Sequence, residues 1–200
     1  ILFKNLLIIE NNLKSILSYH LSKTYGIREN DYLNPNNFNN QPEKKRQIND
    51  LIQKMKRQIR SNADSHTATS HYNTRYGYIP LWIAVKVLSF GIVSELYLIL
   101  KPSDQKSVAE FFDVDADDLA TYLPVLANYR NLCAHEEILF DHRVQRKIED
   151  TRFHELLEIP KIGDEYIYGK DDLFALIIIL KQMLRKDDFN SLIRELDYEI

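Results

Sequence analysis

Apolar residues recur at steps of three and four along most of this 200-residue chain, as in α-helices that each bury one face. The pattern is clear over residues 2–25, where Gly26 predicts the end of the helix, and again over residues 42–60. Five glycines and six prolines are too few for the frequent turns of a β-sandwich. The sequence therefore predicts an all-α bundle of about seven helices, in a single domain over residues 1–200.

The remaining helices are expected from their boundary residues. The run from Leu173 to Leu180 is apolar on all sides, which is typical of a central core helix, and Asp171 is the expected N-cap. Trp82, Phe90 and Gly91 are expected to serve packing and close helix approach. We expect helices over residues 80–100, 103–112, 115–135 (kinked or restarted at Pro124), 143–158 and 171–186. Residues 30–40 are expected to form a loop, residues 61–78 a long loop or a short helical excursion, and residues 159–169 a connector.

The apolar run over residues 79–100 is long enough to cross a bilayer. It contains Lys86 and Glu95, which helical spacing puts on opposite sides, so a buried amphipathic helix is favoured and a membrane-associated effector is the alternative. The single cysteine, Cys133, excludes a disulfide framework and indicates a reducing, cytoplasmic location. The chain begins at Ile1 and not at Met, which is compatible with a preceding segment that is missing here.

Positive charge is concentrated in residues 42–60. This segment has a net charge of +5, whereas the whole chain has −3, which leaves −8 elsewhere. A basic helix face can bind the backbone of RNA even in an acidic protein, although a solvated surface explains it equally well. The seven basic residues are Lys44, Lys45, Arg46, Lys54, Lys56, Arg57 and Arg60.

Several common sites are absent from the sequence. It has no glycine-rich phosphate loop and no Gly-x-Ser-x-Gly nucleophile elbow. His66 and His71 lack an evident third metal ligand, so we expect neither a metal nor a cofactor. The remaining candidate for chemistry is the segment from Arg130 to His135.

On a helix, Asn131 and His135 lie one turn apart on the same face, and the long side chain of Arg130 can reach the same region. These side chains suit metal-free cleavage of RNA. An imidazole can move the proton of the 2′-hydroxyl or of the leaving oxygen, a guanidinium can neutralise the phosphorane, and an amide can orient either group. The spacing alone also fits a capping arginine and a hydrogen-bonded histidine near a helix end.

Three sequence blocks resemble the Abi-like (abortive infection) family of bacterial phage-defence proteins. The resemblance covers most of the chain and identifies it as similar to HEPN domains, whose Arg-x4–6-His motif forms an RNase site. The blocks, in chain order, are Ile-Glu-Asn-Asn-Leu-Lys-Ser from Ile9, His71-Tyr72 with Tyr-Ile-Pro-Leu-Trp and Leu-Ser-Phe-Gly from Tyr78 to Gly91, and Arg-Asn-Leu-Cys-Ala-His-Glu-Glu from Arg130 continuing to Arg143.

The resemblance implies a phage- or toxin-related RNA endonuclease with Arg130, Asn131 and His135 as catalytic residues. It also implies a homodimer with composite sites, and a small RNA or an antitoxin as a further partner. The family pattern places an arginine three residues after the histidine, where this chain has Ile138, so Arg143 or the basic helix would have to replace it. The alternative is a catalytically silent module that binds RNA or a partner.

RNA contacts are expected outside the catalytic motif as well. His71 and Tyr72 can stack on bases, and the basic helix can bind phosphates, while structural roles for all of them are the alternative. The predicted RNA-binding residues are Lys44, Lys45, Arg46, Lys54, Arg57, Arg143, His71 and Tyr72.

Overall fold

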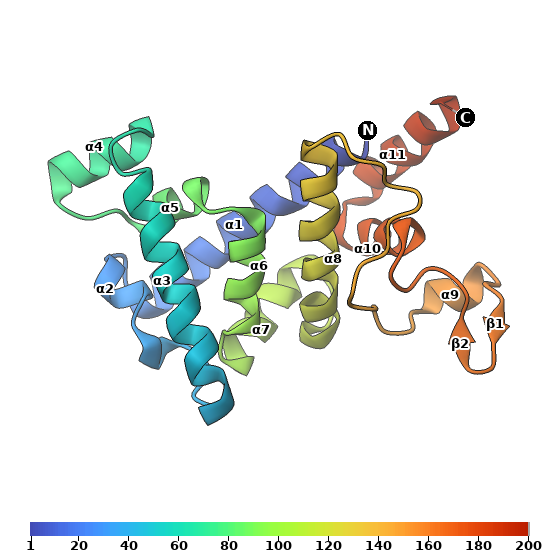
Figure 1. Cartoon of the computed structure of the whole chain (residues 1–200), viewed down its shortest axis with the longest axis horizontal. Helices are drawn as coiled ribbons and strands as arrows, with labels where there is room; N and C mark the ends of the chain where they lie inside the picture. Colours follow the sequence, from blue (N-terminus) through green and yellow to red (C-terminus); the bar gives the residue numbers. More distant parts are fainter. Residues whose placement is uncertain (200) are drawn as a thin grey trace. The chain divides into compact units, whose positions relative to one another are not determined.

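The computed structural model describes residues 1–199, and this part of the chain is mostly helical (Figure 1). The chain forms two compact units. One comprises Asn11–Phe111, and the other comprises Ile1–Glu10 together with the chain from Phe112 onward. Helix α1 (Leu2–Tyr25) supplies residues to both units and ends before Gly26, whose φ of 109° confirms the predicted stop.

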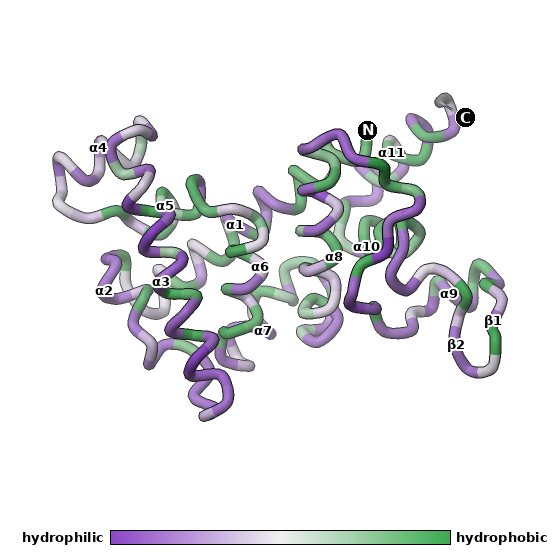
Figure 2. The backbone as a smooth tube through the Cα atoms, viewed as in Figure 1, coloured by the Kyte–Doolittle hydropathy of each residue, from purple (hydrophilic) through white to green (hydrophobic). Residues whose placement is uncertain are grey.

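The unit Asn11–Phe111 is built on amphipathic helices. The apolar residues predicted to face inward from the basic segment are all buried, and in Figure 2 the tube of α3 changes repeatedly between hydrophilic and hydrophobic colours. Besides its part of α1, this unit contains α2 (Glu29–Tyr32), η1 (Pro35–Asn37), η2 (Pro42–Lys44), α3 (Lys45–Ser61), α4 (Thr67–Tyr76), α5 (Leu81–Val87), α6 (Phe90–Leu98), α7 (Pro102–Ala109) and the start of η3 (Glu110–Phe112).

The prediction of one helix over residues 80–100 is wrong. The backbone of Leu88 is extended, and Ser89 begins α6 as an N-cap whose Oγ accepts a hydrogen bond from the Ile92 N–H. The predicted close approach at Gly91 is also wrong, because a Cβ there would meet nothing within 4 Å. Trp82 is 38% exposed and is therefore not a core residue. In the described part of the chain, no helix is long and apolar enough to cross a membrane.

The other unit is centred on α8 and α10, which pack against each other. Helix α8 begins after Asp115 and continues through Pro124, so of the two predicted alternatives, a kink or a restart, the restart does not occur. Gln182 of α10 donates a 2.8 Å hydrogen bond to the buried Tyr122 hydroxyl of α8. The elements of this unit are α8 (Ala116–Ala134), α9 (Arg152–Leu156), β1 (Lys161–Ile162), β2 (Glu165–Tyr166), α10 (Leu173–Met183) and α11 (Lys186–Glu199).

The predicted helix over residues 143–158 is mostly absent. Only α9 forms there, and the preceding chain is extended because the N–H groups of Val144 and Ile148 donate to the carbonyls of Asp171 and Lys170. Val144 and Ile148 are four residues apart, which is also the spacing of apolar residues on one face of a helix. Residues 161–166 form a two-stranded antiparallel hairpin instead of a plain connector.

The prediction of Asp171 as the N-cap of α10 is wrong. Asp172, and not Asp171, is its N-cap, since the Asp172 carboxylate accepts the N–H of Ala175. The described residues contain eleven α-helices and not seven, because the chain breaks at Leu88 and adds short helices such as α2 and α9. The mostly helical fold class is confirmed.

Candidate functional site

The predicted catalytic segment forms the C-terminal end of α8. Asn131 lies in its last turn, and His135 is the C-cap, with its N–H donating to the carbonyls of Asn131 (3.1 Å) and Leu132 (3.2 Å). Both side chains are exposed. Within residues 1–199, the imidazole of His135 has no hydrogen-bond partner. It is therefore open to a ligand.

The chain leaves α8 through a tight C-terminal motif. Glu136 adopts a left-handed conformation with a φ of 56°, and the Glu137 N–H donates a 3.0 Å hydrogen bond back to the Leu132 carbonyl. Glycine usually occupies this left-handed position, because a side chain there is strained. The residue that directly follows His135 thus holds local strain at the predicted site.

Arg130 lies one turn before this end and is bound to a buried carboxylate. Its Nε donates a 2.8 Å hydrogen bond to Oε2 of Glu10 in α1, and its Cζ lies 6.0 Å from the centre of the Phe3 ring. The side chain of Glu10 is 4% exposed and that of Arg130 is 27% exposed. The structure therefore brings Arg130 to Glu10, and no contact between Arg130 and His135 forms in the described residues.

Glu10 is a site residue that sequence reasoning missed. It follows Ile9 in a helix whose buried residues are mostly apolar, and it is the one buried residue of that helix with a carboxylate, at 3% exposure. A carboxylate at such a position needs a cation, because burial of an unpaired charge is very costly. That mismatch between charge and periodicity was the signal that could have found it.

Cys133 lies between the motif residues but is poorly suited to nucleophilic chemistry. Burial raises the pKa of its thiol, so the reactive thiolate is disfavoured. The partly buried Cys133 therefore serves as a small packing residue.

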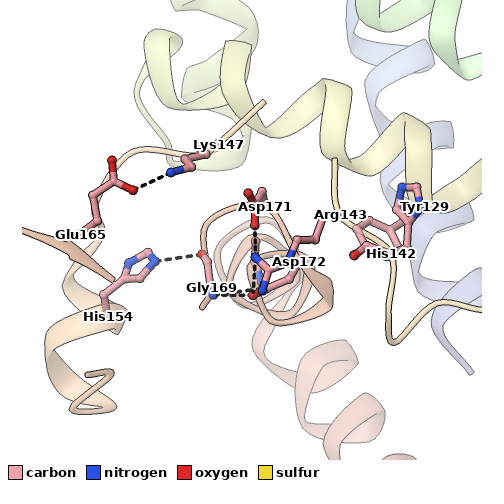
Figure 3. Close-up of polar contacts among 10 residues, drawn as sticks. Tyr129, His142, Arg143, Lys147, His154, Glu165, Gly169, Asp171 and Asp172 are labelled. Atoms are coloured by element: carbon pink, nitrogen blue, oxygen red, sulfur yellow. Dashed lines mark hydrogen bonds and ion pairs between the residues drawn. The ribbon is translucent and has the colours of Figure 1, made fainter. Parts of the chain in front are cut away.

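Arg143 lies close to two carboxylates at the start of α10 (Figure 3). Its Nη1 is 2.6 Å from Oδ1 of Asp171 and 3.8 Å from Oδ2 of Asp172, while the Asp172 carboxylate also accepts the N–H of Gly169. The ion pair reduces the positive charge that Arg143 can offer to a phosphate. A pocket of about 300 Å³ adjoins this group and is lined by Phe140, Asp141, His142, Arg143, Tyr168, Asp172, Leu173 and Phe174.

The basic residues of segment 42–60 differ in their exposure and in their contacts. Lys45 and Arg57 are exposed, and Arg46 is exposed with a long 3.8 Å contact to Asp50. Two of the five predicted RNA-binding residues of this segment are engaged within the unit. Lys44 donates to the carbonyl of Leu98, and Lys54 forms an ion pair with Glu95 at 2.9 Å.

His71 and Tyr72 belong to an aromatic cluster on and after α4. The centre of the Tyr72 ring lies 5.6 Å from that of His71 and 5.3 Å from that of Tyr76. The rings of Tyr76 and Tyr78 are 6.4 Å apart. The guanidinium groups of Arg75 and Arg28 lie over the rings of Tyr76 and Tyr78. Half-exposed rings beside cations can stack on nucleic-acid bases, and the sequence identified only two members of this cluster.

The predicted site residues divide between the two units. Arg130, Asn131, His135 and Arg143 belong to the unit of α8, whereas the residues of α3 and α4 belong to the unit Asn11–Phe111. No group of three or more His, Cys, Asp or Glu side chains suited to a metal ion occurs among the described residues.

Comparison with known families decides the identity of the chain. The family model described as Abi-like protein matches residues 1–141. The chain belongs to the Abi-like family. Membership of this family suggests a role in abortive infection, a defence against phage. No curated protein and no solved structure matches the chain.

The region shared with the Abi-like family contains Glu10 and the whole segment from Arg130 to His135. It ends just before His142 and Arg143. Asp171 and Asp172, the carboxylates beside Arg143, therefore lie beyond the part of the chain that the Abi-like family model describes.

Proposed function

We propose that this Abi-like protein is a metal-independent RNA endonuclease that acts in phage defence. The observation that carries the proposal is the exposed imidazole of His135 at the end of α8, one turn after the exposed amide of Asn131. Arg130, five residues before His135, is oriented by Glu10 through Nε. Its terminal amino groups make no other hydrogen bond within residues 1–199 and can bind a phosphate.

The proposed reaction uses the nucleophile that RNA itself carries. The 2′-hydroxyl oxygen attacks the adjacent phosphorus, the bond from phosphorus to the 5′-oxygen breaks, and the products are a 2′,3′-cyclic phosphate and a 5′-hydroxyl. His135 takes the 2′-hydroxyl proton or gives a proton to the leaving oxygen. Arg130 stabilises the charge on the phosphorane, and Asn131 orients the phosphate or the imidazole.

A second copy of the chain would complete this site. The guanidinium of Arg130 is turned toward Glu10, and His135 stands at a different angle around the helix end. A symmetric pair can bring the α8 end of one copy against that of the other, so that the residues of two motifs surround one phosphate. Homodimer formation is therefore part of the proposal.

RNA would be held by the unit Asn11–Phe111 as well as by the motif. Lys45, Arg46 and Arg57 are exposed on α3 and can bind phosphates, and the rings of His71 and Tyr72 can stack on bases. Lys44, Lys54 and Arg143 are already engaged and would contribute less. A small RNA or an antitoxin as a regulatory partner also belongs to the proposal.

The test is cleavage of labelled total RNA by the purified chain in EDTA. We expect wild type to release fragments with cyclic-phosphate and 5′-hydroxyl ends. His135→Ala should reduce the rate by at least about 100-fold, the usual contribution of a general acid or base. Arg130→Lys should also reduce it strongly, because lysine keeps the charge but loses the planar fork.

Glu137→Ala is the matched control, since this exposed side chain lies two residues after His135 in the same terminal motif. Its activity should equal that of wild type. Equal cleavage by wild type and His135→Ala would refute the assignment.

A catalytically silent RNA-binding or partner-binding module is the second candidate. The ion pair between Arg130 and Glu10 favours it, because a paired and largely covered arginine also serves stability alone. In that case RNA is retained by wild type and by His135→Ala, and neither protein cleaves it.

A further inference from the structure

A groove of about 890 Å³ lies between α1 and α5 in the unit Asn11–Phe111. Neither the predicted catalytic residues nor the basic helix contribute to it. Residues of α1 at helical spacing and residues of α5 line the groove, together with Ile27. The lining consists of Asn11, Lys14, Ser15, Ser18, Tyr19, Ser22, Lys23, Ile27, Trp82, Val85 and Lys86.

The charge of the groove has one sign. Lys14 and Lys23 come from α1 and Lys86 comes from α5, and the residues that line the groove include no Asp or Glu. The exposed cations of Lys23 and Lys86, with no carboxylate among the lining residues, create a positive potential that attracts an anionic ligand. The groove is therefore electrostatically complementary to phosphate groups.

Two aromatic side chains of the groove are open to solvent. Trp82 is 38% exposed although its neighbours Leu81 and Ile83 in α5 are buried, and Tyr19 is 68% exposed. Lys23 lies 5.7 Å from the centre of the Tyr19 ring. Exposed rings beside lysines form the combination that binds single strands, because every base can stack on a ring while the cations follow the backbone.

We propose that this groove binds a segment of single-stranded RNA, with bases on Trp82 and Tyr19 and phosphates on Lys23 and Lys86. The identity of the ligand rests on the proposed function, whereas the site is separate from the catalytic motif. Lys14 and Lys23 are nine residues apart on α1, roughly 14 Å along the helix at 1.5 Å per residue. The groove therefore accommodates several nucleotides.

The polar wall of the groove argues against an amphipathic helix as its occupant. Such a helix needs a continuous apolar surface beneath it. The α1 wall instead presents the exposed polar side chains of Asn11 and Ser15 beside its lysines. Hydroxyl and amide groups suit a sugar-phosphate backbone, to which polar side chains commonly donate hydrogen bonds.

Trp82 is the single tryptophan of the chain, so its fluorescence reports on the groove directly. The experiment titrates the full chain, as the His135→Ala variant that leaves RNA intact, with a single-stranded RNA oligonucleotide of about 12 residues. We expect saturable quenching as bases stack on the indole. The combined variant Lys23→Ala with Lys86→Ala should weaken the binding measured by fluorescence about tenfold or more, because phosphate contacts supply much of the affinity.

The control is Lys106→Ala with Lys186→Ala, which removes the same charge from exposed positions outside the groove. It should leave the titration nearly unchanged. Equal weakening by both double variants would overturn the proposal, as would equal quenching by an acidic peptide or by double-stranded RNA.

The groove and the nuclease can fail separately. RNA that binds or is cleaved without any change in Trp82 fluorescence would overturn the proposal of an RNA-binding groove and leave the proposed function intact. If quenching depends on Lys23 and Lys86 but the wild-type chain cleaves no RNA, the proposal of an RNA-binding groove is supported and the proposal of nuclease activity is refuted.

Discussion

Nε of Arg130 donates a 2.8 Å hydrogen bond to a carboxylate oxygen of Glu10, and the two residues are 120 positions apart in the chain. Glu10 is almost fully covered, whereas Arg130 retains some exposure. Arg130→Ala should therefore destabilise the chain more than Glu10→Gln, because it removes the 2.8 Å ion pair from a carboxylate that stays buried and charged. We expect the free energy of unfolding to fall by about 3 kcal/mol and about 1 kcal/mol respectively, measured by urea unfolding.

The same pair links stability to activity. Glu10→Gln leaves Arg130 in place but removes the charge that orients it, so RNA cleavage should fall by about tenfold while the protein stays folded. Activity has to be measured well below the unfolding transition of each variant. Unchanged cleavage by a folded Glu10→Gln protein would show that Glu10 serves stability and does not position the guanidinium.

Glu136 offers a second test at the end of α8. Its φ of 56° is unfavourable for a residue with a side chain and favourable for glycine. Glu136→Gly should raise the free energy of unfolding by about 0.5–1 kcal/mol. The neighbouring Glu137→Gly should not raise it, because φ there is not positive. A less stable Glu136→Gly protein would contradict the assignment of strain to this residue.

His154 holds the segment between α9 and α10 together (Figure 3). The Thr151 N–H donates to its Nδ1 at 3.0 Å, so Nε2 carries the proton and donates to the Gly169 carbonyl at 2.9 Å. The side chain is fully buried. His154→Ala should lower the free energy of unfolding by about 3 kcal/mol, from the cavity and the lost hydrogen bonds.

Arg152→Ala is the control for His154, since this residue of α9 is exposed. Its free energy of unfolding should stay within about 0.5 kcal/mol of wild type. Equal effects of the two substitutions would mean that the histidine does not anchor the segment.

Alkaline pH should weaken the core around α8. Burial raises the pKa of Tyr122 to about 12, whereas tyrosine in an unfolded chain ionises near pH 10. The unfolded state then releases its proton first, so the stability from this group is complete below pH 10 and is lost as the pH rises through 12. The unfolding free energy should fall less steeply between pH 10 and 12 in Tyr122→Phe than in wild type. The difference in slope should correspond to about one proton.

Urea unfolding at a series of pH values gives the slope of stability against pH, and tyrosinate absorbance followed against pH gives the ionisation of the tyrosines. Tyr129, whose pKa burial also raises to about 12, should still titrate late in the Tyr122→Phe variant. An unchanged slope of stability against pH in that variant would contradict the buried, neutral state of Tyr122.

The helices that bury one regular stripe were predictable from the sequence. Helix α1 and its stop at Gly26, and the inner face of α3, follow from apolar periodicity alone. The break at Leu88 was not predictable in this way, because the run on both sides is apolar and the Ser89 cap is a single polar residue. The extended chain at Val144 depends on backbone hydrogen bonds to residues about 25 positions away, which no local pattern records.

The candidate site was predictable in its residues but not in its partners. The placement of Asn131 and His135 near the end of a helix follows from spacing. The partner of Arg130 comes from a helix far away in the sequence, and the carboxylates beside Arg143 come from the two residues that precede α10. Such ion pairs arise from tertiary packing. Trp82 was expected to serve packing, and its 38% exposure depends on tertiary structure that the local sequence does not record.

The most direct test of the account uses an RNA oligonucleotide that contains a mapped cleavage site, in EDTA. One version is all ribose, and the other lacks only the 2′-hydroxyl next to the scissile phosphate. The account predicts that wild type cleaves the first version to a cyclic phosphate and leaves the second intact at that position. Cleavage of both versions at the same position would contradict attack by the 2′-hydroxyl and, with it, the proposed roles of Arg130 and His135.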